Sequence, residues 1–175
     1  MAMKSYSTAP LFVIAGSSFG LAAVLLVGAL SGLEIVINVS ASEPVGFYRI
    51  VPPSPSGFHR GLMVIFPVPT PFESLVYGRG WEKPGTPLLK NIGALAGDSV
   101  CIRDTVFEIN GTPIGPVAER DRSGLPLPRI RGCFRIEAGY FLPVSAYNAR
   151  SFDGRYLGPQ PLSVITGEAK PLWTF

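Results

Sequence analysis

Histidine, cysteine and charged residues are scarce in this 175-residue chain, and each shortage excludes a class of site. Only 15% of the residues are charged, against about a quarter in a typical soluble domain. The single histidine, His59, stands in a loop rich in Pro, Ser and Gly, so neither a Cys/His zinc site nor a Ser-His-Asp triad is expected. No phosphate-binding glycine loop, HExxH or EF-hand pattern occurs. We therefore expect no metal and no cofactor.

Clustered positive charge is also missing. The formal net charge is +3, but there is no basic run and no patch that mixes Arg or Lys with aromatic residues, so nucleic acid is not an expected partner. The two cysteines, Cys101 and Cys133, are too far apart for a CxxC redox motif. A disulfide and a pair of buried free thiols both remain open.

What the chain has in excess is an apolar stretch, Ala9–Leu33, without a single charge. As a helix it would rise about 37 Å, enough to cross a hydrocarbon core of about 30 Å. A cleaved signal peptide has a shorter core of about 7–15 residues and a small-x-small site, so we expect a retained transmembrane anchor. Lys4 precedes the span and Glu34 follows it. The positive-inside bias then places residues 1–8 in the cytoplasm and 34–175 in the periplasm, outside a bacterial inner membrane.

The exported part, 34–175, is expected to be a mainly β, barrel-like domain, because short apolar or alternating runs alternate with Gly and Pro turns. Asn110-Gly111 is a typical hairpin turn. We expect an irregular loop over 67–87, a polar turn over 151–159 and no convincing helix after the anchor. The expected strands lie within 35–50, 62–66, 88–95, 99–104, 106–110, 133–145 and the C-terminal run from 162.

One serine stands in a rigid setting. In Ser40-Ala41-Ser42-Glu43-Pro44-Val45-Gly46, proline and glycine bracket a tight turn directly after Ser42. Such a turn can present the Ser42 hydroxyl as a nucleophile, and the Ser42 N–H with the Ser40 hydroxyl can form an oxyanion hole. The alternative is a solvated turn that follows a membrane helix, where Ser and Pro are common.

A nucleophilic hydroxyl needs a base, and with histidine discounted the candidate is a lysine. A free lysine has a pKa of about 10.4, so only about one in a thousand is neutral near pH 7.4, and burial is needed to lower the pKa. Lys4 and Lys170 lie at the chain ends, and Lys83 lies in a polar Gly/Pro stretch. Lys90, within the apolar run 88–92, is the candidate base. An outward-pointing strand lysine is the alternative.

Five segments in order resemble the type I signal peptidase superfamily, which uses a Ser/Lys dyad, and most closely its TraF-type conjugative-transfer branch. NVSASEPVGFYR is similar to the pattern N-x-x-x-S-x-P-x-G-x-Y, which puts the nucleophile on Ser42. PLLKNIGALAGDSV resembles the K-R-V-x-A-x-P-G-D segment and puts the base on Lys90, with Ala96 in place of the usual proline. VFEINGTPI, SFDGRYLGP and the ending VITGEAKPLWTF also match.

The resemblance implies further roles and a signal-peptidase-like β-barrel or sheet fold. By the SFDGRYLGP match, Ser151 would hydrogen-bond the lysine amine, and Asp153 and Arg155 would pair and brace the wall of the site. The implied function is maturation of membrane-tethered exported preproteins, pilins or other subunits of a conjugative (type IV) secretion apparatus. The bilayer and proteins of that apparatus are the other implied partners.

Two alternatives remain open. A general housekeeping leader peptidase shares the dyad, but its serine is usually followed by Met, with the proline one place later. A non-enzymatic, membrane-anchored β domain of a secretion complex is the second alternative, and it leaves the pairing of Ser42 with Lys90 unexplained.

Overall fold

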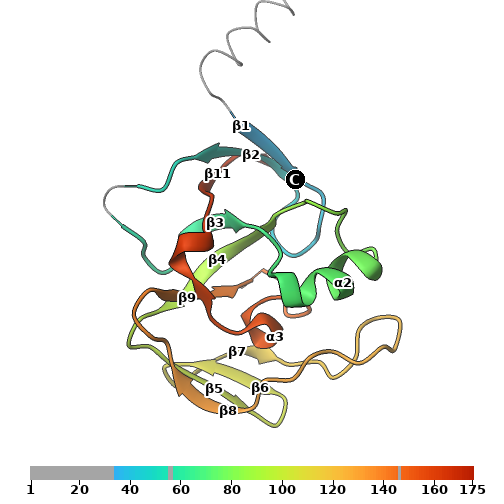
Figure 1. Ribbon diagram of the computed structural model, residues 1–175, viewed down its shortest axis with the longest axis vertical. Helices are drawn as coiled ribbons and strands as arrows, with labels where there is room; N and C mark the ends of the chain where they lie inside the picture. The colour runs from blue at the N-terminus through green and yellow to red at the C-terminus, as the bar shows by residue number, and fades with distance from the viewer. Residues whose placement is uncertain (1–33, 55–56, 146) are drawn as a thin grey trace, which may run out of the picture. The chain divides into compact units, whose positions relative to one another are not determined.

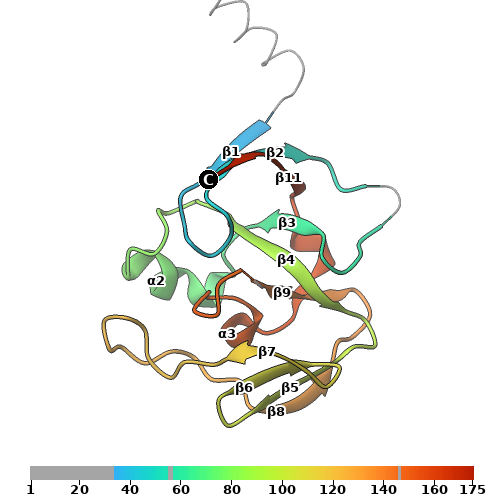
Figure 2. The ribbon, with the colours of Figure 1, turned by 180° about the vertical axis from the view of Figure 1, so that it is seen from behind.

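The computed structural model describes residues 34–54, 57–145 and 147–175 (Figures 1 and 2). The chain divides into two units, Met1–Glu34 and Ile35–Phe175, and the second is described here by itself. The anchor expected over 9–33 lies outside the described residues. Among those that are described, no helix has the length and apolar character needed to cross a membrane.

The described residues form a mainly β unit, which confirms that part of the predicted fold. Seven strands make one sheet in the order β1-β2-β11-β3-β4-β9-β10, and four make a second in the order β7-β6-β5-β8. Both views place the four-stranded sheet at the end away from β1, β2 and β11. The strands are β1 Glu34–Asn38, β2 Gly46–Val51, β3 Met63–Phe66, β4 Leu88–Leu95, β5 Ser99–Arg103, β6 Val106–Ile109, β7 Thr112–Pro116, β8 Gly132–Arg135, β9 Tyr140–Val144, β10 Gln160–Pro161 and β11 Gly167–Thr174.

The alternation read from the sequence decides which side chains enter the core. In β2, Tyr48 and Ile50 are buried, whereas Phe47 and Arg49 are exposed, as expected of a strand with one face in the core. The turn between β6 and β7 has positive φ at both Asn110 (51°) and Gly111 (76°). That backbone conformation is the reason for the Asn-Gly pair, and the hairpin prediction is confirmed.

Apolar packing joins the two sheets and covers the face of β4. Leu142 and Val144 of β9 pack with Val100 and Phe107 of the four-stranded sheet. A second cluster lies under the helix α2, Thr70–Gly78, and includes Ile92 of β4. Each fully buried side chain of this size contributes about 1.5–3 kcal/mol. Both clusters thus hold β4, the strand that carries Lys90.

Two short helices correct the expectation that no helix follows the anchor. α2 lies inside the stretch 67–87, which was expected to be irregular. Pro71 is tolerated in its first turn, Glu73 suits the positive end of the helix dipole, and Val76 is buried. α3, Gly154–Leu157, replaces the expected polar turn and is buried throughout. Flanking prolines and glycines concealed α2, and a single turn is too short to show a helical period.

Cys101 and Cys133 form a disulfide, which settles the question left open above. The two residues lie directly opposite each other on β5 and β8. The bond closes a loop of 32 residues that contains the β6–β7 hairpin and the segment before β8.

Removing this disulfide is expected to lower the free energy of unfolding by about 3–4 kcal/mol, the loop-closure entropy for this separation. The test is urea denaturation of the Cys101→Ala/Cys133→Ala variant beside oxidised and reduced wild type. Reduced wild type should match the double variant. Equal midpoints for oxidised and reduced wild type would contradict the prediction.

Candidate active site

The turn that carries Ser42 is held by the side chain of Asn38, at the end of β1. Its amide nitrogen Nδ2 lies within hydrogen-bond distance of three backbone carbonyl oxygens, those of Ser40 (3.0 Å), Glu43 (2.9 Å) and Pro44 (3.0 Å). Its Oδ1 accepts from the Ser40 N–H at 3.1 Å. Asn38 is buried, so these bonds are shielded from water and fix the turn.

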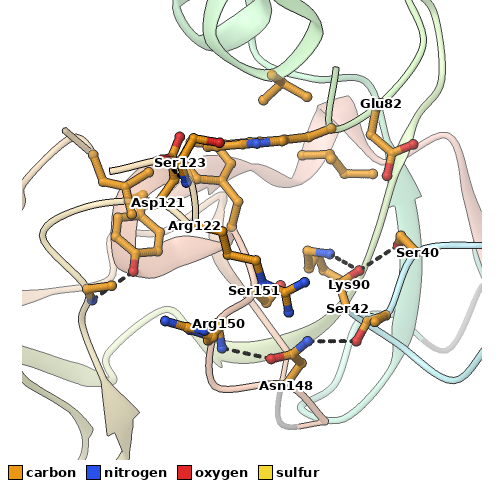
Figure 3. Close-up of a pocket in the computed structure, with 18 of the residues that line it drawn as sticks. Ser40, Ser42, Glu82, Lys90, Asp121, Arg122, Ser123, Asn148, Arg150 and Ser151 are labelled. Atoms are coloured by element: carbon orange, nitrogen blue, oxygen red, sulfur yellow. Dashed lines mark hydrogen bonds between the residues drawn. The ribbon is translucent and has the colours of Figure 1, made fainter. Parts of the chain in front are cut away.

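The side chains of Lys90 and Ser42 are in direct contact. The Lys90 Nζ lies 2.9 Å from the Ser42 Oγ and also donates to the Leu89 carbonyl oxygen at 2.9 Å. Figure 3 shows the lysine pointing at the serine, with Ser40 on the other side of the hydroxyl. Two residues 48 positions apart in the sequence are therefore in hydrogen-bond contact.

β-strand geometry explains why this lysine is buried. Alternate residues of β4 share a face, so Lys90 stands between Leu88 and Ile92, which both belong to the core under α2. Its exposed fraction is only 3%. Burial penalises the ammonium form and lowers the pKa of Lys90 below the ordinary lysine value.

Four charged neighbours modify that effect. The carboxyl groups of Asp153, Glu43 and Glu82 act against burial and raise the pKa of Lys90, whereas the Arg155 guanidinium lowers it further. Burial is the largest cause, so the direction remains downward. The site thus raises the fraction of Lys90 in the neutral form, which can accept a proton, above that of a free lysine.

Ser40 extends the contact on the far side of the nucleophile. Its Oγ lies 2.9 Å from the Ser42 Oγ and 3.0 Å from the Asn38 Oδ1. When the Lys90 amine is neutral, it can accept the Ser42 hydroxyl proton.

The backbone N–H of Ser42 donates no hydrogen bond to another residue within the described part of the chain.

Asp153 and Arg155 form the expected ion pair and are linked to the turn of Ser42 through Ser145. Their Oδ2 and Nη2 atoms are 3.4 Å apart, and both side chains are buried. The Ser145 N–H donates to Asp153 at 2.8 Å, and Arg155 donates to the Ser145 carbonyl oxygen at 3.0 Å. The Ser145 hydroxyl in turn donates to the Ser42 carbonyl oxygen. The buried pair therefore supports the turn 40–44, which carries the candidate nucleophile Ser42 and is called the nucleophile turn below.

Gly154, between Asp153 and Arg155, is required by close packing. A Cβ at this position would lie 2.6 Å from the Pro143 carbonyl oxygen on β9, so any larger residue would push α3 away from the sheet. The Asp153 carboxylate also accepts from the Arg155 N–H at 3.1 Å and so caps the short helix.

Ser151 is placed differently from the prediction. It lines the same cavity as Lys90, but its buried hydroxyl has no hydrogen-bond partner among the described residues. The bonds of the Lys90 Nζ go instead to Ser42 and to the backbone of Leu89. The expected bond between Ser151 and the lysine amine is therefore absent from this structure.

A cavity of about 300 Å³ opens beside the pair (Figure 3). Aromatic side chains form part of its lining: Phe152 stacks on Tyr156 at 5.4 Å and packs against Trp81 at 5.2 Å. Further lining residues come from the nucleophile turn, from α2 and from the loops 118–127 and 148–152. The cavity therefore combines an aromatic part with polar side chains and reaches the Ser42–Lys90 pair.

A family model described as signal peptidase, peptidase S26, matches residues 8–173. This chain belongs to the signal peptidase S26 family. It is 31% identical over 166 residues to the "Conjugal transfer protein TraF" of Agrobacterium fabrum, covering 89% of this chain and 90% of that protein. It is 32% identical over 166 residues to a "Plasmid transfer protein TraF" of Escherichia coli, covering 89% and 92%. The resemblance to TraF-type signal peptidases is confirmed.

Several residues that build the site of this S26 family member were not found from the sequence. Ser145 acts through its backbone and hydroxyl, and the Asn148 Nδ2 donates to the Ala41 carbonyl oxygen at 2.9 Å. Polar residues that bind backbone groups form no spacing pattern. Asn38 was visible as the first residue of the N-x-x-x-S pattern, but its role in the turn was not.

Proposed function

We propose that this chain is a membrane-anchored serine endopeptidase with a Ser42/Lys90 dyad. The observation that carries the proposal is the 2.9 Å contact between the Lys90 Nζ and the Ser42 Oγ, made by a lysine that is almost fully buried. A desolvated amine within hydrogen-bond reach of a serine hydroxyl is the arrangement that general-base activation requires.

The reaction is acyl transfer. The Ser42 Oγ attacks the scissile carbonyl carbon while its proton passes to the neutral Lys90 Nζ. The resulting ammonium gives that proton to the leaving amine as the C–N bond breaks. Water then attacks the acyl-enzyme ester, with Lys90 again taking the proton. Lys90 returns that proton to the Ser42 Oγ as the ester C–O bond breaks and the product carboxylate leaves. The Ser42 N–H and the Ser40 hydroxyl are the proposed donors to the oxyanion.

The proposed substrates are exported preproteins of a conjugative transfer apparatus, pilins or other secreted subunits. Three observations support this class: the family match, the names of the relatives, and the apolar stretch before residue 34. Ser42 lies eight positions after Glu34, so the chain spans at most about 28 Å between them. That reach suits substrates tethered to the outer face of a bacterial inner membrane.

Mass spectrometry of pilins and other exported subunits, with and without this gene, tests the function. We expect precursors to accumulate in its absence and to be processed when the wild-type gene, but not the Ser42→Ala gene, is returned. Accumulation of precursors from secreted proteins in general would favour a housekeeping leader peptidase instead. Processing that does not depend on the gene would favour a non-enzymatic component of the secretion complex.

A further inference from the structure

Glu43, the residue after the nucleophile, is a buried carboxyl group that the dyad chemistry does not use. Its exposed fraction is 1%. Its Oε2 accepts a hydrogen bond from the Asn91 Nδ2 at 3.1 Å, while its Oε1 has no partner within the described residues. The proton of the nearby Ser145 hydroxyl is already donated to the Ser42 carbonyl oxygen.

The environment of this carboxyl group disfavours its ionised form. A buried carboxylate with one oxygen unpaired loses much of its hydration without full compensation. Burial raises the pKa of Glu43 to about 7. Lys90 and the side chains of Ser145 and Asn91 act in the opposite direction but do not outweigh it. The group therefore changes charge near neutral pH, beside the nucleophile.

The contacts of Glu43 run parallel to those of the dyad. Ser42 contacts Lys90, and the next residue, Glu43, contacts Asn91, the next residue of β4. Successive strand residues point to opposite faces, so Lys90 and Asn91 contact the nucleophile turn from different faces of β4. Two links on neighbouring residues restrict rotation of the turn about the strand, which a single Ser–Lys contact cannot do.

We propose that Glu43 is a positioning residue of the dyad: its link to Asn91 fixes the nucleophile turn against β4, and its charge controls how tightly Lys90 holds its proton. The role of Lys90 as base rests on the proposed function. The link and the electrostatic coupling do not.

The sign of the coupling follows from the charges around the pair. Glu43 faces Lys90, Asp153 and Tyr48, and Lys90 also faces Glu82 and Arg155. An ionised Glu43 stabilises the Lys90 ammonium, whereas a protonated one does not. A variant that is permanently neutral at position 43 should release the lysine proton at lower pH. Because the two groups interact, the wild-type protons come off as a coupled pair.

The test is a lysine titration by NMR on the full chain in detergent micelles, labelled with ¹³C-lysine. The chain has four lysines, so the signal of Lys90 is assigned by its loss in Lys90→Met. We expect the titration midpoint of Lys90 in Glu43→Gln to lie at lower pH than in wild type. Glu168→Gln is the matched control: Glu168 is also buried, but its carboxylate accepts from the Ser54 N–H. Its Lys90 midpoint should equal that of wild type.

Peptide hydrolysis gives the functional readout, with an internally quenched peptide that contains an Ala-x-Ala site. We expect kcat/KM of Glu43→Gln at about pH 8, where the wild-type Glu43 is ionised and holds the Lys90 proton, to exceed that of wild type several-fold. A merely structural defect cannot produce such a gain. Glu43→Asp keeps the charge but is too short for the link to Asn91, so its kcat should fall while the Lys90 midpoint stays near wild type.

A Lys90 midpoint that moves no further in Glu43→Gln than in Glu168→Gln would overturn the inference. So would a Glu43→Asp variant with unchanged kcat. If no variant, wild type included, hydrolyses any peptide, the proposed function fails, while the NMR titration still decides the coupling between Glu43 and Lys90.

Discussion

The Lys90→Ala variant is expected to lose peptidase activity by about a thousandfold or more while still accumulating in the membrane. The Lys90 Nζ is the only described side-chain amine in hydrogen-bond contact with the Ser42 hydroxyl, so its removal leaves the nucleophile without a base. Ser42→Ala should be equally inactive, and the double variant should be no worse, because the two groups act as a unit. The measurement is processing of a co-expressed prepilin.

Three controls make this prediction specific. Lys90→Arg keeps a cation but cannot supply a neutral base, so it should also be inactive. Lys83→Ala removes an exposed lysine and should leave activity intact. His59→Ala should also be active, because that histidine is exposed and its ring lies within hydrogen-bond distance of the neighbouring Arg60 carbonyl oxygen, away from Ser42. Unimpaired cleavage by Lys90→Ala would refute the dyad, and loss of activity in a folded His59→Ala protein would revive a triad.

The pH dependence of the wild-type enzyme follows from the same lysine. Burial lowers the pKa of Lys90, so its neutral fraction near pH 7 exceeds that of a free lysine. In the proposed mechanism the neutral amine is the active form, and it is lost as pH falls through the folded-state pKa. We therefore expect kcat/KM to rise with pH on the acid side, and a rise toward low pH would contradict the assignment.

The free energy of unfolding of the Asp153→Ala variant is expected to be about 3–5 kcal/mol lower than that of wild type. Asp153 and Arg155 are buried, so removing the carboxylate leaves the guanidinium without its counter-charge in a low-dielectric interior. The Ser145 N–H loses its acceptor as well. Urea denaturation of the oxidised protein measures the change, and the loss of support for Ser42 should also lower activity.

An exposed ion pair provides the matched control. Arg129 and Glu119 are 2.7 Å apart, but their side chains are 38% and 59% exposed. Glu119→Ala should therefore change the free energy of unfolding by less than about 1 kcal/mol, because water screens this pair and solvates the remaining arginine. Similar losses in Asp153→Ala and Glu119→Ala would show that burial is not what makes the Asp153–Arg155 pair important.

Local patterns predicted most of the strands. Alternation in 99–104 and 106–110 and the Asn110-Gly111 turn indicated a hairpin, because strand period and left-handed turn conformations are properties of a few adjacent residues. The same local rules missed α2, since its prolines and glycines are typical of loops. They also missed α3, which is held by the Asp153 cap and by packing against β9 rather than by helix propensity.

The sequence by itself determined the candidate nucleophile and the candidate base, because Ser42 and Lys90 stand in short segments that resemble a known dyad. It also determined the Asp153–Arg155 pair, which the structure confirms. Only the tertiary structure decided which polar groups complete the site: Ser145 and Asn91 support the turn, and Ser151 makes no bond to the lysine. The reason is physical. Chemical identity is local, but burial, charge state and hydrogen-bond partners depend on which distant strands pack together.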